Sequence, residues 1–153
     1  MARGTQLSPT GSQKAIPFKV CLIGNSSVGK TCIVERYVNN KFSANSAITL
    51  AAAFNARTLD VSPGGLPTTR VKLQLWDTAG SEEYRSINQL YYKKAAVILL
   101  VYSVTDYESF DGLAYWHGEV AQNADPDCIK FVVGAKIDDD DIEEGEAVPK
   151  QVG

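Results

Sequence analysis

The fold of this chain is decided by residues 24–31, which read Gly24-Asn25-Ser26-Ser27-Val28-Gly29-Lys30-Thr31. The stretch satisfies the pattern GxxxxGK[ST]. It follows a short apolar run, Phe18 to Ile23, and it opens a segment, Lys30 to Val38, in which apolar residues recur at helical spacing. A strand, a glycine-rich loop and a helix in this order are the context in which the pattern marks a phosphate-binding loop.

The residue types in this loop suit a phosphate. Glycines at 24 and 29 let successive backbone N–H groups turn inward, and the N-terminus of the helix adds the positive end of its dipole. Lys30 supplies a full positive charge at the β- and γ-phosphates, and the Thr31 hydroxyl is a ligand for Mg²⁺. The alternative interpretation is a glycine-rich turn followed by a solvated lysine.

Two strand-like segments follow the first helix. They cover Ala52 to Val61 and Arg70 to Trp76, and the residues between them read Ser-Pro-Gly-Gly-Leu-Pro at positions 62–67. Because glycine and proline are strong turn formers, this pattern predicts an antiparallel hairpin with a long tip.

Continuous apolar runs mark two further strands, Ala96 to Val104 and Ile129 to Val133, which are typical of strands buried on both faces. The polar segment Ser81 to Tyr92 ends in a helix, and from Asp106 apolar residues recur every three to four positions. This alternation predicts an α/β fold with a mostly parallel sheet and helices on both faces. Ligands of such sheets bind beyond the carboxyl ends of the strands.

A second motif, Asp77-Thr78-Ala79-Gly80, ends the strand expected beside the first one. The Asp77 carboxylate can reach Mg²⁺ directly or through a water. The Gly80 N–H can meet a γ-phosphate because no Cβ stands in the way. DxxG alone is a weak signal, but together with the phosphate loop it indicates a nucleotide switch.

At these two motifs the chain resembles the Ras superfamily of small GTPases, which have the P-loop NTPase fold. Trp76 to Gly80, Tyr91-Tyr92 and the segment from Thr105 to Phe110 resemble its Rab branch. The resemblance implies a cytoplasmic switch in vesicle traffic that binds GTP or GDP with Mg²⁺. It also implies one switch segment between the first helix and the hairpin, and a second one after Gly80.

The resemblance carries specific roles onto this sequence. It makes Thr49 the first-switch threonine, which ligates Mg²⁺ and contacts the γ-phosphate only in the GTP state; an ordinary loop threonine is the alternative. Magnesium would be held by Thr31, by Thr49 and, through water, by Asp77, with Lys30 and Gly80 taking part in catalysis. The residues expected at the nucleotide are Asn25, Ser26, Ser27, Val28, Gly29, Lys30, Thr31, Cys32, Thr49, Asp77, Gly80, Ala135, Lys136 and Asp138.

Partners are also implied. The resemblance places Phe54, Trp76 and Tyr91 on the surface that Rab proteins present to effectors, and it places exchange factors and activating proteins on the switch segments. Three aromatic side chains could form an apolar hot spot that reorders with the nucleotide. The alternative is that Phe54 and Trp76 are core residues of the hairpin.

Two residues depart from the family pattern. Ser81 stands where glutamine normally orients the attacking water, and its hydroxyl is too short for that task, so we expect slow GTP hydrolysis. The guanine motif Asn-Lys-x-Asp is represented by Ala135-Lys136-Ile137-Asp138. Asp138 can still accept hydrogen bonds from guanine, but the asparagine amide is missing, so we expect weaker binding and a reduced preference for guanine.

Composition limits the remaining choices. A chain of 153 residues is one domain, which we expect at 16–153 after a flexible tail at 1–15. Seven of the 18 acidic residues lie between Asp138 and Glu146 and predict a solvated loop. Scattered basic residues argue against nucleic-acid binding. Cys21 and Cys32 are expected in the core, and His117 on a helix.

The resemblance also predicts a last strand, a guanine-contacting loop and a final helix, none of which this sequence contains. We therefore expect an incomplete domain with an exposed apolar patch, and no membrane anchor within this chain. Membrane association would need a lipidated C-terminal segment or a partner. The leading hypothesis is a Rab-type switch with weakened hydrolysis. The alternatives are a pseudo-GTPase interaction module that binds little or no nucleotide and, with less support, a P-loop ATPase or kinase.

Overall fold

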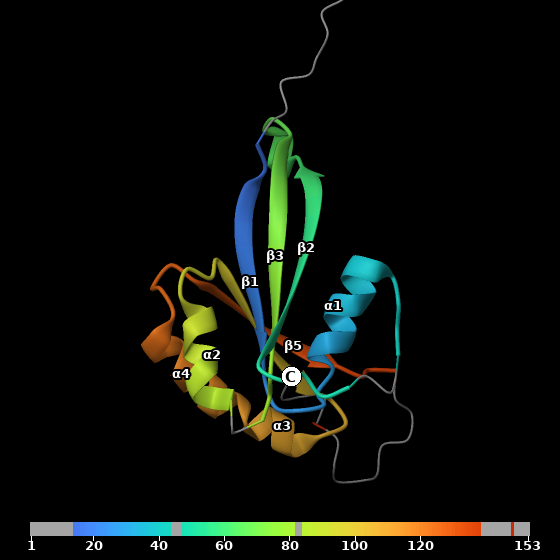
Figure 1. Ribbon diagram of the computed structural model, residues 1–153, viewed down its shortest axis with the longest axis vertical. Helices are drawn as coiled ribbons and strands as arrows, with labels where there is room; N and C mark the ends of the chain where they lie inside the picture. The colour runs from blue at the N-terminus through green and yellow to red at the C-terminus, as the bar shows by residue number, and fades with distance from the viewer. Residues whose placement is uncertain (1–13, 44–46, 82–83, 139–147, 149–153) are drawn as a thin grey trace, which may run out of the picture.

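A computed structural model gives the fold and describes residues 14–43, 47–81, 84–138 and 148. Five strands and four α-helices make up the described part of the chain (Figure 1). Their bounds are β1 Ile16–Ile23, α1 Lys30–Asn39, β2 Ala52–Val61, β3 Thr69–Thr78, α2 Arg85–Tyr92, β4 Val97–Ser103, α3 Tyr107–Asp111, α4 Leu113–Asn123 and β5 Ile129–Ala135, with a short 3-10 turn η1 at Pro63–Gly65.

The strands form one sheet in the order β2-β3-β1-β4-β5. All neighbours are parallel except β2 and β3, which form the antiparallel hairpin that the turn-rich segment predicts. Parallel pairing aligns Leu22 of β1 with Asp77 of β3, so both strands end at the same edge of the sheet. The fold class expected from the sequence is confirmed.

Each face of the sheet has its own core, because successive side chains of a strand point to opposite faces. On one side, Val20 and Leu22 pack with Val34 of α1. On the other side, Cys21 and Ile23 pack with buried side chains of α2 and α4. Helix α1 accordingly covers one face, and α2 and α4 cover the other (Figure 1).

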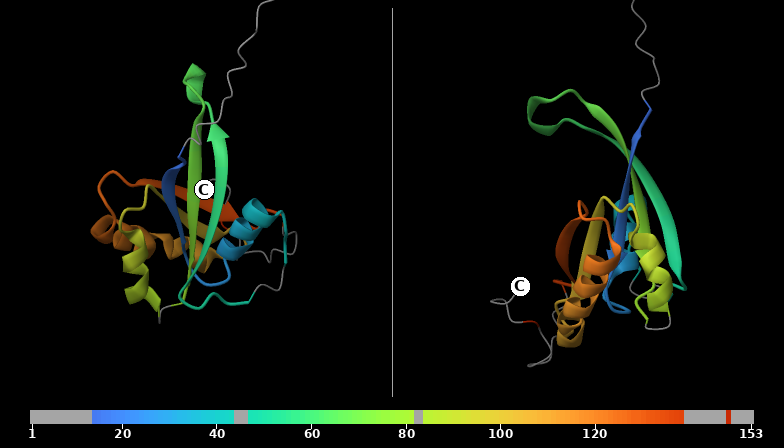
Figure 2. Two further views of the ribbon diagram at one scale, coloured as in Figure 1. Left: turned by 45° about the horizontal axis from the view of Figure 1, so that its top comes forward. Right: turned by 90° about the vertical axis from the view of Figure 1, so that its left-hand side faces the viewer.

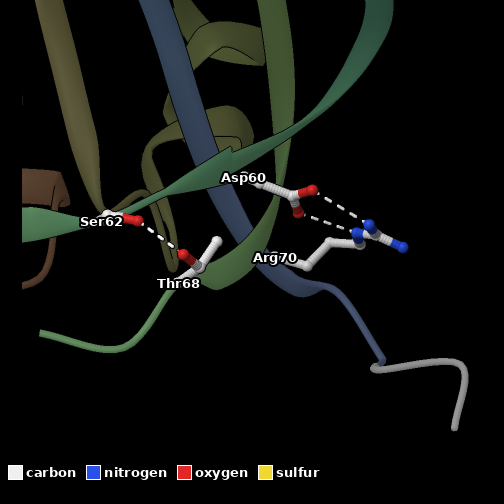
Figure 3. A network of polar contacts seen from close by, with 4 residues as sticks. All are labelled: Asp60, Ser62, Thr68 and Arg70. Atoms are coloured by element: carbon white, nitrogen blue, oxygen red, sulfur yellow. Dashed lines mark hydrogen bonds and ion pairs between the residues drawn. The ribbon is translucent and has the colours of Figure 1, made fainter. Parts of the chain in front are cut away.

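The hairpin of β2 and β3 projects beyond the helices and curves away from the sheet (Figure 2). Near its tip Arg70 donates two hydrogen bonds to the Asp60 carboxylate, at 2.8 and 3.0 Å, and the Ser62 and Thr68 hydroxyls lie 2.6 Å apart (Figure 3). The η1 turn closes the tip, where Gly64 and Gly65 both take positive φ. Cross-strand polar pairs therefore hold the register outside the core.

The helix expected from Asp106 is divided into α3 and α4 at Gly112. Asp106 is the N-cap of α3, and its carboxylate accepts a hydrogen bond from the Ser109 N–H at 3.1 Å. Gly112 keeps right-handed helical dihedrals, so the chain direction changes little. Sequence periodicity predicts the helical region but not this division.

The far edge of the sheet is apolar and exposed, as expected. Within the described residues β5 pairs only with β4, and Ile129, Phe131 and Val132 are 54 to 61% exposed. Almost all of the expected tail, and the acidic run after Asp138, lie outside the described residues. Among the helices that the structure describes, none combines the length and apolar character needed to cross a membrane.

Ala51 offers a test of the backbone at the start of β2. Its φ of 69° is left-handed, a conformation that strains a residue with a Cβ. We expect Ala51→Gly to raise the free energy of unfolding by about 0.5–1 kcal/mol. The strain energy relieved in the folded state exceeds the free energy that glycine's extra conformational entropy gives the unfolded chain. Urea denaturation measures it. Ala52→Gly, inside β2, is the control and should lower stability; a loss of stability in Ala51→Gly would contradict the assignment.

Candidate functional site

The phosphate loop joins β1 to α1 through a backbone that only certain residues accept. Gly24, Ser27 and Gly29 have φ values of 142°, 61° and 109°. A Cβ at Gly24 would lie 2.0 Å from the Val101 carbonyl oxygen, so the loop needs glycine there. Ser27 takes a left-handed conformation without being glycine, which is a strained arrangement typical of functional loops.

Lys30 lies back over the loop that precedes it. Its Nζ donates to the carbonyl oxygens of Gly24 and Asn25, at 2.9 and 2.6 Å, and the residue is 6% exposed. Burial lowers the Lys30 pKa to about 8, and the nearby Asp77 carboxylate opposes this shift. A buried ammonium that donates to two carbonyl oxygens is well suited to pair with an anion.

Three oxygen-bearing side chains from separate elements meet beside this lysine. The Thr31 hydroxyl donates to Asp77 Oδ2 at 2.6 Å, and the Thr49 hydroxyl donates to the same oxygen at 3.3 Å. The two hydroxyl oxygens are 3.0 Å apart. Thr49 comes from the segment before β2, so the structure brings this predicted residue to the site.

The chemistry of this cluster fits a magnesium ion. Asp77 is 1% exposed, and its Oδ1 has no hydrogen-bond partner among the described residues. Burial raises the Asp77 pKa, while hydrogen bonds from Thr31 and Thr49 and the charge of Lys30 oppose that rise. Carboxylate and hydroxyl oxygens are hard ligands of the kind Mg²⁺ prefers, and Mg²⁺ usually keeps several waters.

The Asp77-Thr78-Ala79-Gly80 segment touches the phosphate loop directly. A Cβ at Gly80 would lie 2.4 Å from the Asn25 carbonyl carbon and the Ser26 nitrogen. Asn88 of α2, which is fully buried, donates to the Ala79 carbonyl at 2.9 Å and so fixes the preceding peptide. Sequence reasoning missed Asn88, because a polar residue in a short helix carries no signal of burial.

The residues expected to contact the guanine base lie in different surroundings. Ala135 ends β5 beside the loop, since a Cβ at Gly29 would lie 3.5 Å from the Ala135 Cβ. Lys136 has a left-handed backbone, with φ at 61°, and Asp138 is exposed. The structure therefore joins Ala135 to the phosphate loop and leaves the Asp138 side chain at the surface.

The three predicted surface aromatics form one cluster. Phe54 and Trp76 have ring centroids 5.1 Å apart, and Trp76 and Tyr91 are 5.3 Å apart. Phe54 is half exposed, whereas Trp76 and Tyr91 are half-buried and pack against the core beneath α2 and α4. The Lys19 ammonium lies 5.3 Å from the centre of the Trp76 ring. The cluster therefore reaches the surface at Phe54 and is anchored in the core through Trp76 and Tyr91, and its role as an effector surface stays a prediction.

The remaining candidate residues are structural or peripheral. Cys21 is buried as expected, and burial raises its thiol pKa to about 12. The expectation for Cys32 is wrong, because it is only half-buried, on the first turn of α1 beside the loop. His117 lies exposed on α4. Within the described residues, no group of three or more His, Cys, Asp or Glu side chains could hold a metal.

The model of the Ras family matches residues 19–153. The chain belongs to the Ras family. This Ras-family chain is 45% identical over 125 residues to the Ras-like GTP-binding protein RYL2 of Yarrowia lipolytica, and the match covers 82% of this chain and 57% of RYL2.

Two further relatives support a Rab-like member of the family. Ras-related protein Rab-26 of Mus musculus is 39% identical over 153 residues, with 96% of this chain and 57% of the relative covered. GTP-binding protein ypt2 of Schizosaccharomyces pombe is 39% identical over 141 residues, with 89% and 68% covered. The chain thus spans 57% of the length of RYL2 and Rab-26.

Gly80 provides a test of the close contact between the two motifs. The atoms that a Cβ would meet are backbone atoms, so the strands or the loop must shift to admit it. We expect Gly80→Ala to lower the free energy of unfolding by about 1–3 kcal/mol, as overpacking does. Urea denaturation measures the change. Gly118→Ala is the matched control, because its added Cβ has no described atom within 4 Å outside its own stretch of helix, and alanine favours the helix. Equal stability of Gly80→Ala and wild type would contradict the contact.

Proposed function

We propose that this chain is a Rab-type molecular switch that binds GTP or GDP with Mg²⁺ and recruits effectors in vesicle traffic. The observation that carries the proposal is the meeting of Thr31, Thr49 and Asp77 at 2.6–3.3 Å beside the phosphate loop. Thr49 belongs to the segment between α1 and β2. A metal site that draws one ligand from such a segment can sense which nucleotide is bound.

The residues divide the work of binding. Backbone N–H groups of residues 25–32 surround the phosphates, and the Lys30 ammonium exchanges its carbonyl partners for phosphate oxygens. Thr31 and Thr49 would hold Mg²⁺ directly, and Asp77 would hold it through water. When bound, Mg²⁺ neutralises charge on the β- and γ-phosphates. Gly80 offers its N–H to the γ-phosphate without steric hindrance.

Hydrolysis in this proposal is slow. Ser81 follows Gly80 at the position where the family carries the water-orienting glutamine, and its side chain has a hydroxyl in place of a methylene and a terminal amide group. A water placed for attack on the γ-phosphate therefore lacks its usual orienting group. Stimulation by an activating protein is also reduced, because an arginine finger works together with that glutamine.

Guanine selectivity is reduced but retained. The amide missing at Ala135 would have joined the base to the phosphate loop, and the Ala135 methyl group lies against that loop without replacing the polar contact. The Asp138 carboxylate can accept hydrogen bonds from guanine, and the stem of Lys136 can cover one face of the base. An unpaired polar group in such a site costs about 1–3 kcal/mol of binding free energy.

The aromatic cluster of Phe54, Trp76 and Tyr91 is the proposed effector surface. It spans β2, β3 and α2, so its shape depends on the segments that contact the nucleotide. Exchange factors and activating proteins would bind the switch segments around Thr49 and Ser81. Within the cell we place the protein in the cytoplasm, with membrane association through a lipidated segment or a partner.

A pseudo-GTPase interaction module is the second candidate function. Ser81 and Ala135 favour it, because both remove groups that act on nucleotide, while the aromatic cluster that would bind partners is intact. The intact phosphate loop and the oxygen cluster around Asp77 favour the switch. The two candidates differ in whether the purified chain holds a nucleotide.

The nucleotide content of the purified protein tests the proposal. We expect denaturation to release GDP or GTP, identified by ion-exchange chromatography, and we expect Lys30→Ala to bind GDP about 10- to 100-fold more weakly, since charge-assisted hydrogen bonds are lost. Lys72→Ala, on an exposed side chain of β3, is the matched control and should bind normally. An empty wild-type preparation with no affinity for GDP or GTP would support the interaction module, and a preference for ATP would refute the assignment of Asp138.

Ser81 is tested by single-turnover hydrolysis of GTP. We expect Ser81→Gln to raise the rate about tenfold, which corresponds to about 1.4 kcal/mol of activation free energy. Ser81→Ala should leave the slow rate unchanged, because the serine hydroxyl orients no water. If Ser81→Ala abolished hydrolysis instead, the serine would be the group that activates water and slow turnover would need another cause.

A further inference from the structure

Asn25, the second residue of the phosphate loop, lies where three elements meet. Its Oδ1 accepts a hydrogen bond from Trp116 Nε1 at 2.8 Å, and its backbone oxygen accepts one from Lys30 Nζ at 2.6 Å. Its backbone is also the surface that Gly80 approaches. One residue therefore contacts α4, the phosphate-binding lysine and the DxxG segment.

Trp116, the donor in the hydrogen bond to Asn25, is held in place by packing. Trp116 of α4 is 1% exposed, in the core that α2 and α4 form against the sheet. Its ring packs against Tyr115, with ring centroids 5.3 Å apart. A buried indole N–H needs an acceptor, and this one finds it 91 positions away in the phosphate loop. The indole therefore serves as a fixed donor.

The junction between α3 and α4 is shaped to admit the Asn25 amide. A Cβ at Gly112 would lie 2.9 Å from Asn25 Oδ1 and 3.1 Å from Nδ2. A side chain at position 112 would thus collide with the amide that Trp116 binds. Gly112, which divides the two helices, and the Trp116 indole one turn later together form the site that receives the Asn25 side chain.

We propose that Trp116 is a positioning residue, which acts through Asn25 to hold the first turn of the phosphate loop. The loop has residues with positive φ at both ends, so its conformation depends on contacts from outside. Fixing the Asn25 side chain also fixes the carbonyl that receives Lys30 and the backbone against which Gly80 rests. Nucleotide at the loop and the packing of α4 are thereby coupled. This inference rests on the proposed function.

A double-mutant cycle tests the pair in the full chain. Trp116→Phe keeps an aromatic ring and removes the N–H, and Asn25→Ala removes the acceptor. We expect each to speed GDP dissociation about tenfold, and the double variant to be no faster than Asn25→Ala alone, because the two residues act through one contact. Additive effects would overturn the proposal.

Val120→Ala separates positioning from packing. It truncates a fully buried apolar side chain of the same helix, which offers no donor to Asn25. We expect it to lower stability and to leave GDP dissociation unchanged. If Val120→Ala sped dissociation as much as Trp116→Phe, the effect would be general loosening of α4. Should Trp116→Phe fail to fold, the Asn25→Ala arm still applies, because that side chain is only half-buried.

Hydrogen exchange of the amides of residues 24–30 makes the test independent of nucleotide binding. We expect their exchange in nucleotide-free protein to be about tenfold faster in Trp116→Phe and in Asn25→Ala, and unchanged in Val120→Ala. If wild type bound no guanine nucleotide but the variants differed from it in exchange in this way, the positioning role would stand and the proposed function would fail. If GDP bound and neither exchange nor dissociation changed, the positioning role would fail alone.

Discussion

The parallel register of β1 and β3 is the constraint on which the site depends. Leu22 pairs with Asp77, and the Thr78 hydroxyl donates to the Leu22 carbonyl at 2.8 Å inside the protein. Because the two strands run in the same direction, the phosphate loop and the DxxG segment leave the sheet at one edge. A slip by one residue would turn Asp77 to the opposite face and separate its carboxylate from Thr31.

The strands, helices and turns that depend on a short stretch of sequence could be predicted. The apolar run before Gly24 and the helical spacing after Lys30 give β1, the phosphate loop and α1, and the turn-rich residues 62–67 give the hairpin. The carboxyl-edge rule for parallel sheets then predicts that Asp77 lies near the loop. Thr49 came from family resemblance, because no periodicity or spacing identifies one threonine in an irregular segment.

The features that sequence did not predict are contacts between distant elements. Trp116 belongs to an apolar helical series, so its pattern indicates burial but says nothing of the acceptor that its N–H finds on Asn25. Asn88 is polar, and only the packing of α2 against Ala79 explains its burial. The left-handed backbone at Ala51 is equally hidden, since alanine carries no turn signal. Each depends on how elements meet in three dimensions.

The hairpin has a consequence for how the backbone segments that carry Thr49 and Gly80 are connected. Its ladder begins at the pair Ala52 and Thr78, and the Ala79 N–H extends it by bonding the Ala51 carbonyl at 2.8 Å. Thr49 stands just before this first rung, and Gly80 just after it. A displacement of the backbone on either side of this rung therefore acts on the same hydrogen bond, between the Ala79 N–H and the Ala51 carbonyl. Thr49 and Gly80 are in this way linked mechanically through one pair of strands, although 31 positions separate them in the sequence.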